Sequence, residues 1–111
     1  ALAAAYAKGA TDAGHEVRRI NVADLDFALL RTQADWLQGA VPSGLAEANQ
    51  DLLWADHMVI IFPLWLGSMP ALLKGFLEQV LRVNANPDAT GSTTSDYTKP
   101  LRGTSVRIIV T

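Results

Sequence analysis

Residues 62–76 read FPLWLGSMPALLKGF, and this stretch decides the fold. It joins an all-apolar run, residues 58–62, to a pattern typical of an amphipathic helix that begins at Ala71. Consecutive apolar residues predict a strand covered on both faces, as the strands of a parallel sheet are. Ligands of such sheets bind in the crevice outside the carboxyl ends of the strands. The loop between the strand and the helix is therefore the expected functional site.

The loop itself offers little for acid–base or nucleophilic chemistry. Pro63 ends the strand because it lacks an N–H donor, Pro70 starts the helix with its backbone angle preset, and Gly67 lets a flat ligand approach closely. The other loop side chains are mostly apolar: Leu64, Trp65, Leu66, Ser68 and Met69. This composition favours a planar apolar ring whose heteroatoms accept hydrogen bonds from spare backbone N–H groups. The alternative is a plain loop whose Trp65 caps the core.

On these residues the chain resembles the flavodoxin-like NAD(P)H:quinone oxidoreductases, in the segment of that family that contacts flavin. The similarity is strongest over residues 62–80. The matching positions are Phe62, Pro63, Leu64, Trp65, Leu66, Met69, Pro70, Ala71, Leu72, Leu73, Lys74, Gly75 and Phe76. So many fixed positions within so short a span make the match specific. Weaker similarity lies on both sides, at residues 14–17, 24–25, 54–57 and 108–111.

The resemblance implies a fold, a cofactor and a reaction. The fold is α/β, a flavodoxin-like three-layer α/β/α arrangement around a parallel sheet. The cofactor is FAD or FMN, with NAD(P)H as co-substrate and a quinone-like small molecule as the hydride acceptor. The residues implied to contact the flavin are Pro63, Leu64, Trp65, Leu66 and Gly67. Because the protein's part in this chemistry is to hold the flavin, no catalytic residue is assigned.

The resemblance also implies a homodimer, since the family's flavin sites lie at a two-fold interface. Trp36 and Leu37 lie in residues 28–44, which show no sustained period and form a long excursion in the family. These two side chains are open to either interpretation, local packing or a subunit interface. Two alternatives to an enzyme also remain: an ancillary regulatory subunit of a potassium efflux system, which some relatives resemble, and an inactive fragment.

Composition limits the other function classes. The chain has 111 residues, of which 50% are hydrophobic and 18% are charged, as in one packed globular domain. A net charge of -2 offers no basic face for nucleic acid. There is no Cys, which excludes a disulfide framework and suits a reducing compartment. Apolar runs fall far short of the roughly 20 residues that span a bilayer, so a soluble, cytoplasmic protein is expected.

The periodicity along the chain predicts helices and strands in alternation. Helices are expected at residues 1–13, at residues 45–55 and from Ala71 onward, and strands at residues 15–22, 58–62 and 104–111. The first strand carries Arg18 and Arg19, which suit a solvated sheet edge better than a phosphate site. Residues 83–100, rich in Asn, Pro, Gly, Ser, Thr and Asp, predict a flexible loop.

Charged side chains and His57, outside the loop, are expected to have structural roles or to face solvent rather than to contact a ligand. On the helix from Ala71, Glu78 is placed for an ion pair with Arg82, and Lys74 is expected on the solvated face rather than against a ligand. His57 precedes its strand and should lie at the amino end, opposite the crevice. No histidines and carboxylates show metal-ligand spacing, so no metal site is expected.

Measured against the resembled family, residues 1–111 are expected to form one flavodoxin-like domain that is incomplete at both ends. In the family a first strand and a phosphate-holding loop precede the first helix, and a further glycine-bearing loop follows the last strand expected here. A flavodoxin-type sheet has strand order 2-1-3-4-5, so without the first strand residues 15–22 and 58–62 would flank a gap or pair directly. Flavin would then bind weakly, through its ring alone.

Overall fold

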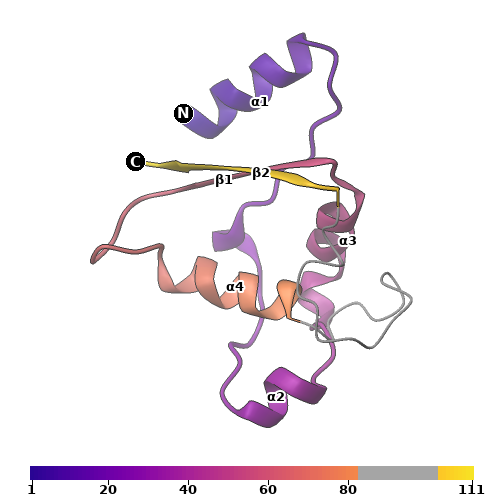
Figure 1. Ribbon diagram of the computed structural model, residues 1–111, viewed down its shortest axis with the longest axis vertical. Helices are drawn as coiled ribbons and strands as arrows, with labels where there is room; N and C mark the ends of the chain where they lie inside the picture. The colour runs from indigo at the N-terminus through magenta and orange to yellow at the C-terminus, as the bar shows by residue number, and fades with distance from the viewer. Residues whose placement is uncertain (83–102) are drawn as a thin grey trace.

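The computed structural model describes residues 1–82 and 103–111, and Figure 1 shows their arrangement. The helices are α1 (Leu2–Asp12), α2 (Gln33–Gln38), α3 (Ala46–Trp54) and α4 (Ala71–Leu81), and the strands are β1 (His57–Phe62) and β2 (Ser105–Val110). Two short 3₁₀ helices, η1 (Val22–Asp24) and η2 (Ser43–Leu45), complete the helices and strands of the described part. The loop expected at residues 83–100 therefore lies outside the described residues.

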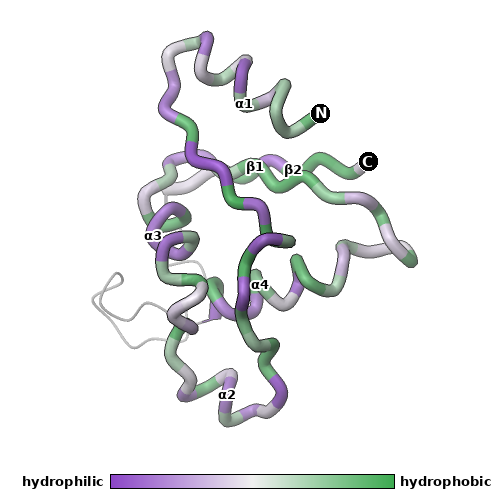
Figure 2. Tube along the Cα trace, turned by 180° about the vertical axis from the view of Figure 1, so that it is seen from behind, coloured by the Kyte–Doolittle hydropathy of each residue, from purple (hydrophilic) through white to green (hydrophobic). Residues whose placement is uncertain are grey.

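β1 and β2 form a parallel two-stranded sheet. Their register pairs His57 with Ser105 at one end and Phe62 with Val110 at the other. Valine and isoleucine dominate both strands, and Figure 2 shows hydrophobic residues along most of their length. The strands expected at residues 58–62 and 104–111 are confirmed, and so is the α/β class with a parallel sheet.

Helices cover the sheet on two sides, which gives three layers. In Figure 1 α1 lies on one side of the strands, and α3 and α4 lie on the other. The buried core lies between the sheet and the helices α3 and α4. Its members come from η2, α3, β1 and α4: Leu45, Ala48, Leu52, Met58, Phe76 and Val80. Burying a large apolar side chain contributes about 1.5–3 kcal/mol, so this cluster is what holds α3 and α4 against the sheet.

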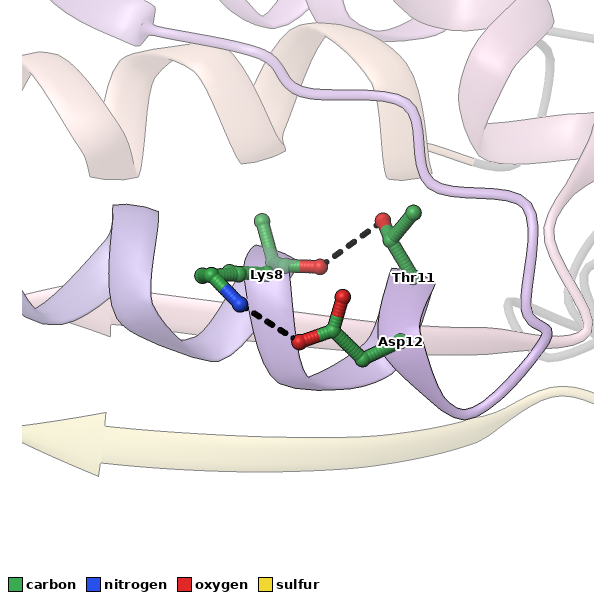
Figure 3. A network of polar contacts seen from close by, with 4 residues as sticks. Lys8, Thr11 and Asp12 are labelled. Carbon is green, nitrogen blue, oxygen red and sulfur yellow. Dashed lines mark hydrogen bonds and ion pairs between the residues drawn. The ribbon is translucent and has the colours of Figure 1, made fainter.

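α1 confirms the first expected helix, but it contributes nothing to the buried core. None of its residues is buried. Its polar face is stabilised within the helix, where Lys8 Nζ donates to Asp12 Oδ2 at 2.6 Å and Thr11 Oγ1 donates to a backbone carbonyl one turn earlier at 2.9 Å (Figure 3). One polar contact reaches the sheet, from Arg107 Nη1 to the hydroxyl of Tyr6 at 3.5 Å.

α4 packs against the extended segment at residues 25–29. Gly75 permits this close approach, because a Cβ at its position would collide with the side chain of Leu29. One turn later the buried Gln79 donates from Nε2 to the carbonyl oxygen of Ala28 at 2.8 Å. These contacts hold the segment on α4, and the helix expected from Ala71 is confirmed.

The strand expected at residues 15–22 is wrong. This segment forms no strand and ends in η1. The guanidinium of Arg18 lies 3.9 Å from the centre of the Trp54 ring, and its Nη1 donates to Asp51 Oδ1 at 3.2 Å. Backbone groups form a strand only beside a neighbour that pairs with them, and in the described residues β1 pairs with β2 alone. Residues 15–22 therefore neither flank a gap as a strand nor pair directly with β1.

Residues 28–44, expected to lack regular structure, contain the short helix α2. Its amino end is a capping box, in which Asp35 N donates to Thr32 Oγ1 at 3.1 Å and Thr32 N donates to Asp35 Oδ2 at 3.2 Å. α2 has 6 residues, which is too few for the repeating apolar stripe that identifies a longer helix. The later helix α3 agrees with the expected residues 45–55.

The ion pair expected between Glu78 and Arg82 is wrong. Arg82 turns inward and is only 1% exposed; it donates from Nη1 to the carbonyl oxygen of Gly39 and from Nη2 to Gln79 Oε1 at 3.3 Å. Glu78 lies near Lys74 instead, with 3.9 Å between Nζ and Oε1, on the solvated face expected for that lysine. Gly39 ends α2, so its carbonyl lies at the negative end of that helix and attracts a cation.

Candidate cofactor site

The loop at residues 63–70 leaves the sheet at the carboxyl ends of both strands. The parallel ladder continues past β1, since Thr111 N donates to Phe62 O at 3.0 Å and Leu64 N donates to Thr111 O at 3.3 Å. Phe62 is buried, so the end of the strand is fixed in the protein. The beginning of the loop is thereby held by both strands. Nothing in the sequence pattern marks Thr111 as an anchor of this loop.

A two-residue turn forms the tip of the loop. Trp65 N donates to Ser68 O at 2.9 Å and Ser68 N donates to Trp65 O at 3.0 Å, which leaves Leu66 and Gly67 between them. Both central residues have positive φ, 49° at Leu66 and 76° at Gly67, as in a type I′ turn. Glycine adopts this conformation freely, whereas a left-handed leucine costs about 1–2 kcal/mol. The turn therefore stores strain at Leu66.

This turn projects apolar side chains into solvent. The exposed fraction is 55% for Leu64, 62% for Trp65 and 106% for Leu66. The alternative in which Trp65 caps the core is therefore contradicted. Three consecutive exposed apolar residues are unfavourable in water unless they meet a ligand or a partner. Together with the strained backbone, they mark the turn as a candidate contact surface.

Unpaired backbone donors lie beside these side chains. In the described part of the chain, nothing accepts a hydrogen bond from the amides of Leu66 and Gly67. α4 begins after Pro70 without a side-chain cap, so among the described residues the amides of Ala71 and Leu72 in its first turn also have no acceptor. Apolar surface combined with N–H donors suits a flat heteroaromatic ring, whose faces are apolar and whose edge carries acceptors.

All the residues proposed from the sequence to contact the cofactor lie together in this loop and are exposed: Pro63, Leu64, Trp65, Leu66 and Gly67. Ser68 adds the backbone groups that close the turn, a role that the sequence pattern did not indicate. The loop holds no acid, no base and no thiol. Its arrangement can bind and orient a ring, and it leaves the reaction chemistry to the bound group.

His57 lies at the other end of the sheet, as the first residue of β1. Its Nδ1 is 2.6 Å from the Oγ of Ser105, its register partner at the start of β2. Because the strands are parallel, the full length of the sheet separates this pair from the loop at residues 63–70. The expected position of His57, opposite the crevice, is confirmed, and the pair fastens the starts of the two strands.

Residues 1–82 and 103–111 contain neither a metal-binding cluster nor a membrane-spanning helix. Within these ranges no three His, Cys, Asp or Glu side chains gather in a way that could hold a metal ion. The same ranges contain no helix with the length and apolar content needed to cross a membrane. The loop at residues 63–70 is thus the strongest candidate site in the described structure.

A family model described as a flavodoxin-like fold matches residues 1–111. The chain belongs to this flavodoxin-like family. The match covers the whole sequence and confirms both the fold class and the resemblance drawn from residues 62–80. In the flavodoxin-like fold the carboxyl ends of the strands are the ligand edge, and that is where the turn with Trp65 lies.

Three curated proteins are similar to parts of this flavodoxin-like chain. An "uncharacterized NAD(P)H oxidoreductase" of Haemophilus influenzae is 37% identical over 43 residues, which are 39% of this chain and 21% of that protein. The "ribosyldihydronicotinamide dehydrogenase-like protein traD" of Penicillium crustosum is 33% identical over 45 residues, 40% of this chain and 17% of that protein. The "uncharacterized NAD(P)H oxidoreductase YcaK" of Escherichia coli is 33% identical over 73 residues, 57% of this chain and 37% of that protein.

The chain thus spans between 17% and 37% of the length of these relatives. No solved structure matches it significantly.

Proposed function

We propose that this chain provides the ring-contacting surface of a flavin-dependent NAD(P)H oxidoreductase, which reduces quinones or related acceptors by two-electron hydride transfer. The cofactor in this proposal is FAD or FMN, and the acceptor is a small quinone-like molecule. The observation that carries the proposal is the exposed, strained turn from Trp65 to Ser68 at the carboxyl ends of the strands of a flavodoxin-like sheet. The printed names of the relatives, two of them NAD(P)H oxidoreductases, support the reaction class.

The residues of the turn fit a flavin ring in two ways. Leu64, Trp65 and Leu66 expose apolar surface to water when no ligand is bound. A planar ring that displaces this water binds with a favourable hydrophobic free energy. The free amides of Leu66 and Gly67 can donate to acceptors on the edge of the ring. Charged side chains are absent from this loop, so contact with the ring leaves no buried charge unpaired.

A bound flavin supplies the hydride chemistry itself. The chain's own residues hold the ring in place and exclude water from its covered face. The positive φ of Leu66 and Gly67 fixes the turn before the ligand arrives, so little backbone freedom remains to be lost on binding. The strain at Leu66 is consistent with a conformation kept for binding rather than for stability.

Isothermal titration of the 111-residue chain with FMN and with FAD tests the proposal directly. We expect one flavin per chain with a dissociation constant on the order of 10 µM, about −7 kcal/mol, because the expected contacts are to the ring alone. The loaded protein is then mixed with NADH or NADPH and a soluble quinone. Oxidation of the nicotinamide supports the enzyme. Flavin binding without oxidation favours the ancillary-subunit alternative, and no binding of either flavin overturns the proposal.

A homodimer and a cytoplasmic location are further parts of this proposal. The exposed Leu37 on α2, 48% accessible to solvent, offers apolar area for the two-fold interface that the family resemblance implies. Leu37→Glu should weaken such a dimer without unfolding the chain. Sedimentation of this variant beside the unmodified chain checks the interface separately from the flavin titration.

A further inference from the structure

The peptide that joins Leu66 to Gly67 is the central peptide of the turn from Trp65 to Ser68. Its N–H belongs to Gly67 and its C=O to Leu66, and the two groups point in opposite directions. Both residues have positive φ, 49° and 76°, which identifies the type I′ turn. If this peptide turned over, the φ of Leu66 would stay positive and that of Gly67 would become negative, as in a type II′ turn. The orientation of this peptide therefore decides whether a ligand meets a donor or an acceptor.

The side chain of Leu66 opposes this reorientation. A residue with a Cβ tolerates positive φ only in the small left-handed region, where ψ is also positive. The first central residue of a type II′ turn combines positive φ with negative ψ, and glycine usually occupies it. Leu66 therefore fits the type I′ turn with some strain and does not fit the type II′ turn. Gly67 sets no such limit, since glycine adopts either sign of φ.

The two arms of the turn disfavour the remaining turn types. Trp65 N donates to Ser68 O at 2.9 Å and Ser68 N donates to Trp65 O at 3.0 Å, so the arms pair as antiparallel strands do. Type I and type II turns have the wrong twist for such arms and would splay them. The hydrogen bond from Leu64 N to Thr111 O and the start of α4 after Pro70 hold the arms from outside. The turn is thus confined to type I′.

Packing in the described structure does not explain a leucine at this position. The side chain of Leu66 is fully exposed, so it buries no apolar area there. Asparagine and aspartate usually take the first central position of a type I′ turn, because they tolerate positive φ better than leucine does. An exposed residue in a strained conformation indicates a role outside the folding of the chain.

We propose that Leu66 is a positioning residue, which keeps the N–H of Gly67 directed at the edge of the bound ring whatever the oxidation state of the ring. This inference rests on the proposed function. When a flavin takes a hydride from NAD(P)H, an acceptor nitrogen at its edge becomes an N–H donor. The fixed peptide donates to the oxidised edge but cannot turn its C=O toward the new N–H. Oxidised flavin therefore binds more tightly than reduced flavin, and by linkage the bound reduced flavin gives up its hydride more readily.

Three substitutions at Leu66 separate the restriction of the peptide from the loss of the side chain. Leu66→Gly removes the Cβ and permits the type II′ turn. Leu66→Ala and Leu66→Asn remove the leucine side chain but keep the Cβ, so they are the matched controls. Anaerobic isothermal titration with FMN, and with FMN reduced by dithionite, gives a dissociation constant for each oxidation state.

The ratio of the reduced to the oxidised dissociation constant is the quantity that tests the proposal. Leu66→Gly should lower this ratio about threefold to tenfold, the range expected for one hydrogen bond. Leu66→Ala and Leu66→Asn should leave the ratio at the value of the unmodified chain, although both weaken the binding of both forms. An unchanged ratio in Leu66→Gly, or an equal fall in all three variants, would overturn the proposal.

Nuclear magnetic resonance without flavin distinguishes this proposal from the proposed function. The amide protons of Leu66 and Gly67 are close together in a type I′ turn and farther apart in a type II′ turn. The nuclear Overhauser effect between the two amides should be strong in the unmodified chain, in Leu66→Ala and in Leu66→Asn, and weaker in Leu66→Gly. If no variant binds either form of FMN, the proposed function fails and this comparison alone decides whether Leu66 restricts the peptide. An effect of equal strength in Leu66→Gly would then overturn the restriction.

Discussion

The guanidinium of Arg82, at the end of α4, donates to the carbonyl oxygen of Gly39, at the end of α2. It joins two elements 43 positions apart and does so almost wholly out of water, at 1% exposure. Its Nε has no partner in the described structure, and burial lowers the pKa of the guanidinium. The side chain therefore acts as an internal tie for residues 28–44 rather than as a surface charge.

Replacing this tie should cost more than replacing an exposed charge. We expect Arg82→Ala to lower the free energy of unfolding by about 2–4 kcal/mol, because it leaves a cavity and an unpaired Gly39 carbonyl. Arg82→Met keeps most of the volume and should lose about 1–3 kcal/mol. Lys74→Ala removes only an exposed pair and should change stability by less than about 0.5 kcal/mol. Urea denaturation followed by tryptophan fluorescence gives all three values, and equal losses for Arg82→Ala and Lys74→Ala would contradict the tie.

The strained turn offers a stabilising substitution. Leu66→Asn should raise the free energy of unfolding by about 0.5–1 kcal/mol, because asparagine tolerates positive φ and loses no buried area at this fully exposed position. Gly67→Ala should lower it by about 1 kcal/mol for the opposite reason. Thermal melts of both variants check the pair of signs. A stabilised Gly67→Ala would mean that the turn is not type I′.

Trp65 and Trp54 make a matched pair for separating binding from stability. Trp65→Ala should weaken flavin binding roughly tenfold, the loss of about 1.4 kcal/mol of ring contact, while the melting temperature moves little. Trp54→Ala removes the ring beneath Arg18, so it should lower the melting temperature and leave flavin affinity unchanged. Flavin titrations beside thermal melts provide both readings. A large loss of stability with unchanged affinity in Trp65→Ala would place that ring in the core.

α2 should be sensitive to acid. The backbone amide of Arg31 is the main cause that lowers the pKa of Asp35 from its ordinary value of 3.8, helped by hydrogen bonds with Thr32. A carboxyl with a depressed pKa stabilises the fold above its unfolded pKa, and this contribution is lost as the pH falls through the folded value. The free energy of unfolding should therefore drop below about pH 4, and Asp35→Asn should flatten that drop. Asp12→Asn, which removes an exposed carboxylate outside α2, is the control for the change in net charge.

The cap of the same helix gives a separate test at neutral pH. Thr32→Ala removes the hydroxyl that accepts from Asp35 N, and it should cost about 1 kcal/mol of unfolding free energy. Thr32→Ser keeps the acceptor and should restore most of that loss. If both variants are equally destabilised, the methyl group rather than the cap is what matters.

Local patterns in the sequence were enough to place the long helices and both strands. β1 has apolar residues at every position after His57, and the helix from Ala71 has a clear stripe, so neither depends on distant contacts to be recognised. Residues 15–22 were misread because their apolar spacing suits a strand, whereas a strand also needs a neighbour. Instead, Arg18 contacts Trp54 and Asp51, which are more than 30 positions away in the sequence, so the pattern of neighbouring residues does not predict this contact.

The candidate site also has features that the sequence predicts and features that it does not. The position of the loop follows from its place between an apolar strand and a helix that begins directly after Pro70, whereas the sequence leaves open whether Trp65 caps the core or is exposed. The type I′ turn does not follow from the sequence, because Leu66–Gly67 lacks the asparagine or aspartate that usually announces it. The spacing of four residues predicts an ion pair between Arg82 and Glu78. Arg82 instead donates to the carbonyl oxygen of Gly39, 43 positions away in the sequence.

The pairing of His57 with Ser105 spans 48 positions of sequence, and this has a consequence for the order of folding. The helices depend on contacts within a few residues and can form early. Closing the long connection between β1 and β2 costs chain entropy before the contacts of the sheet can form and offset that cost. During synthesis the pairing of β1 with β2 cannot form until β2 has left the ribosome. The cofactor loop, whose Leu64 amide is held by Thr111, then takes its final shape last, so the surface proposed to meet the ring matures only when translation has passed that threonine.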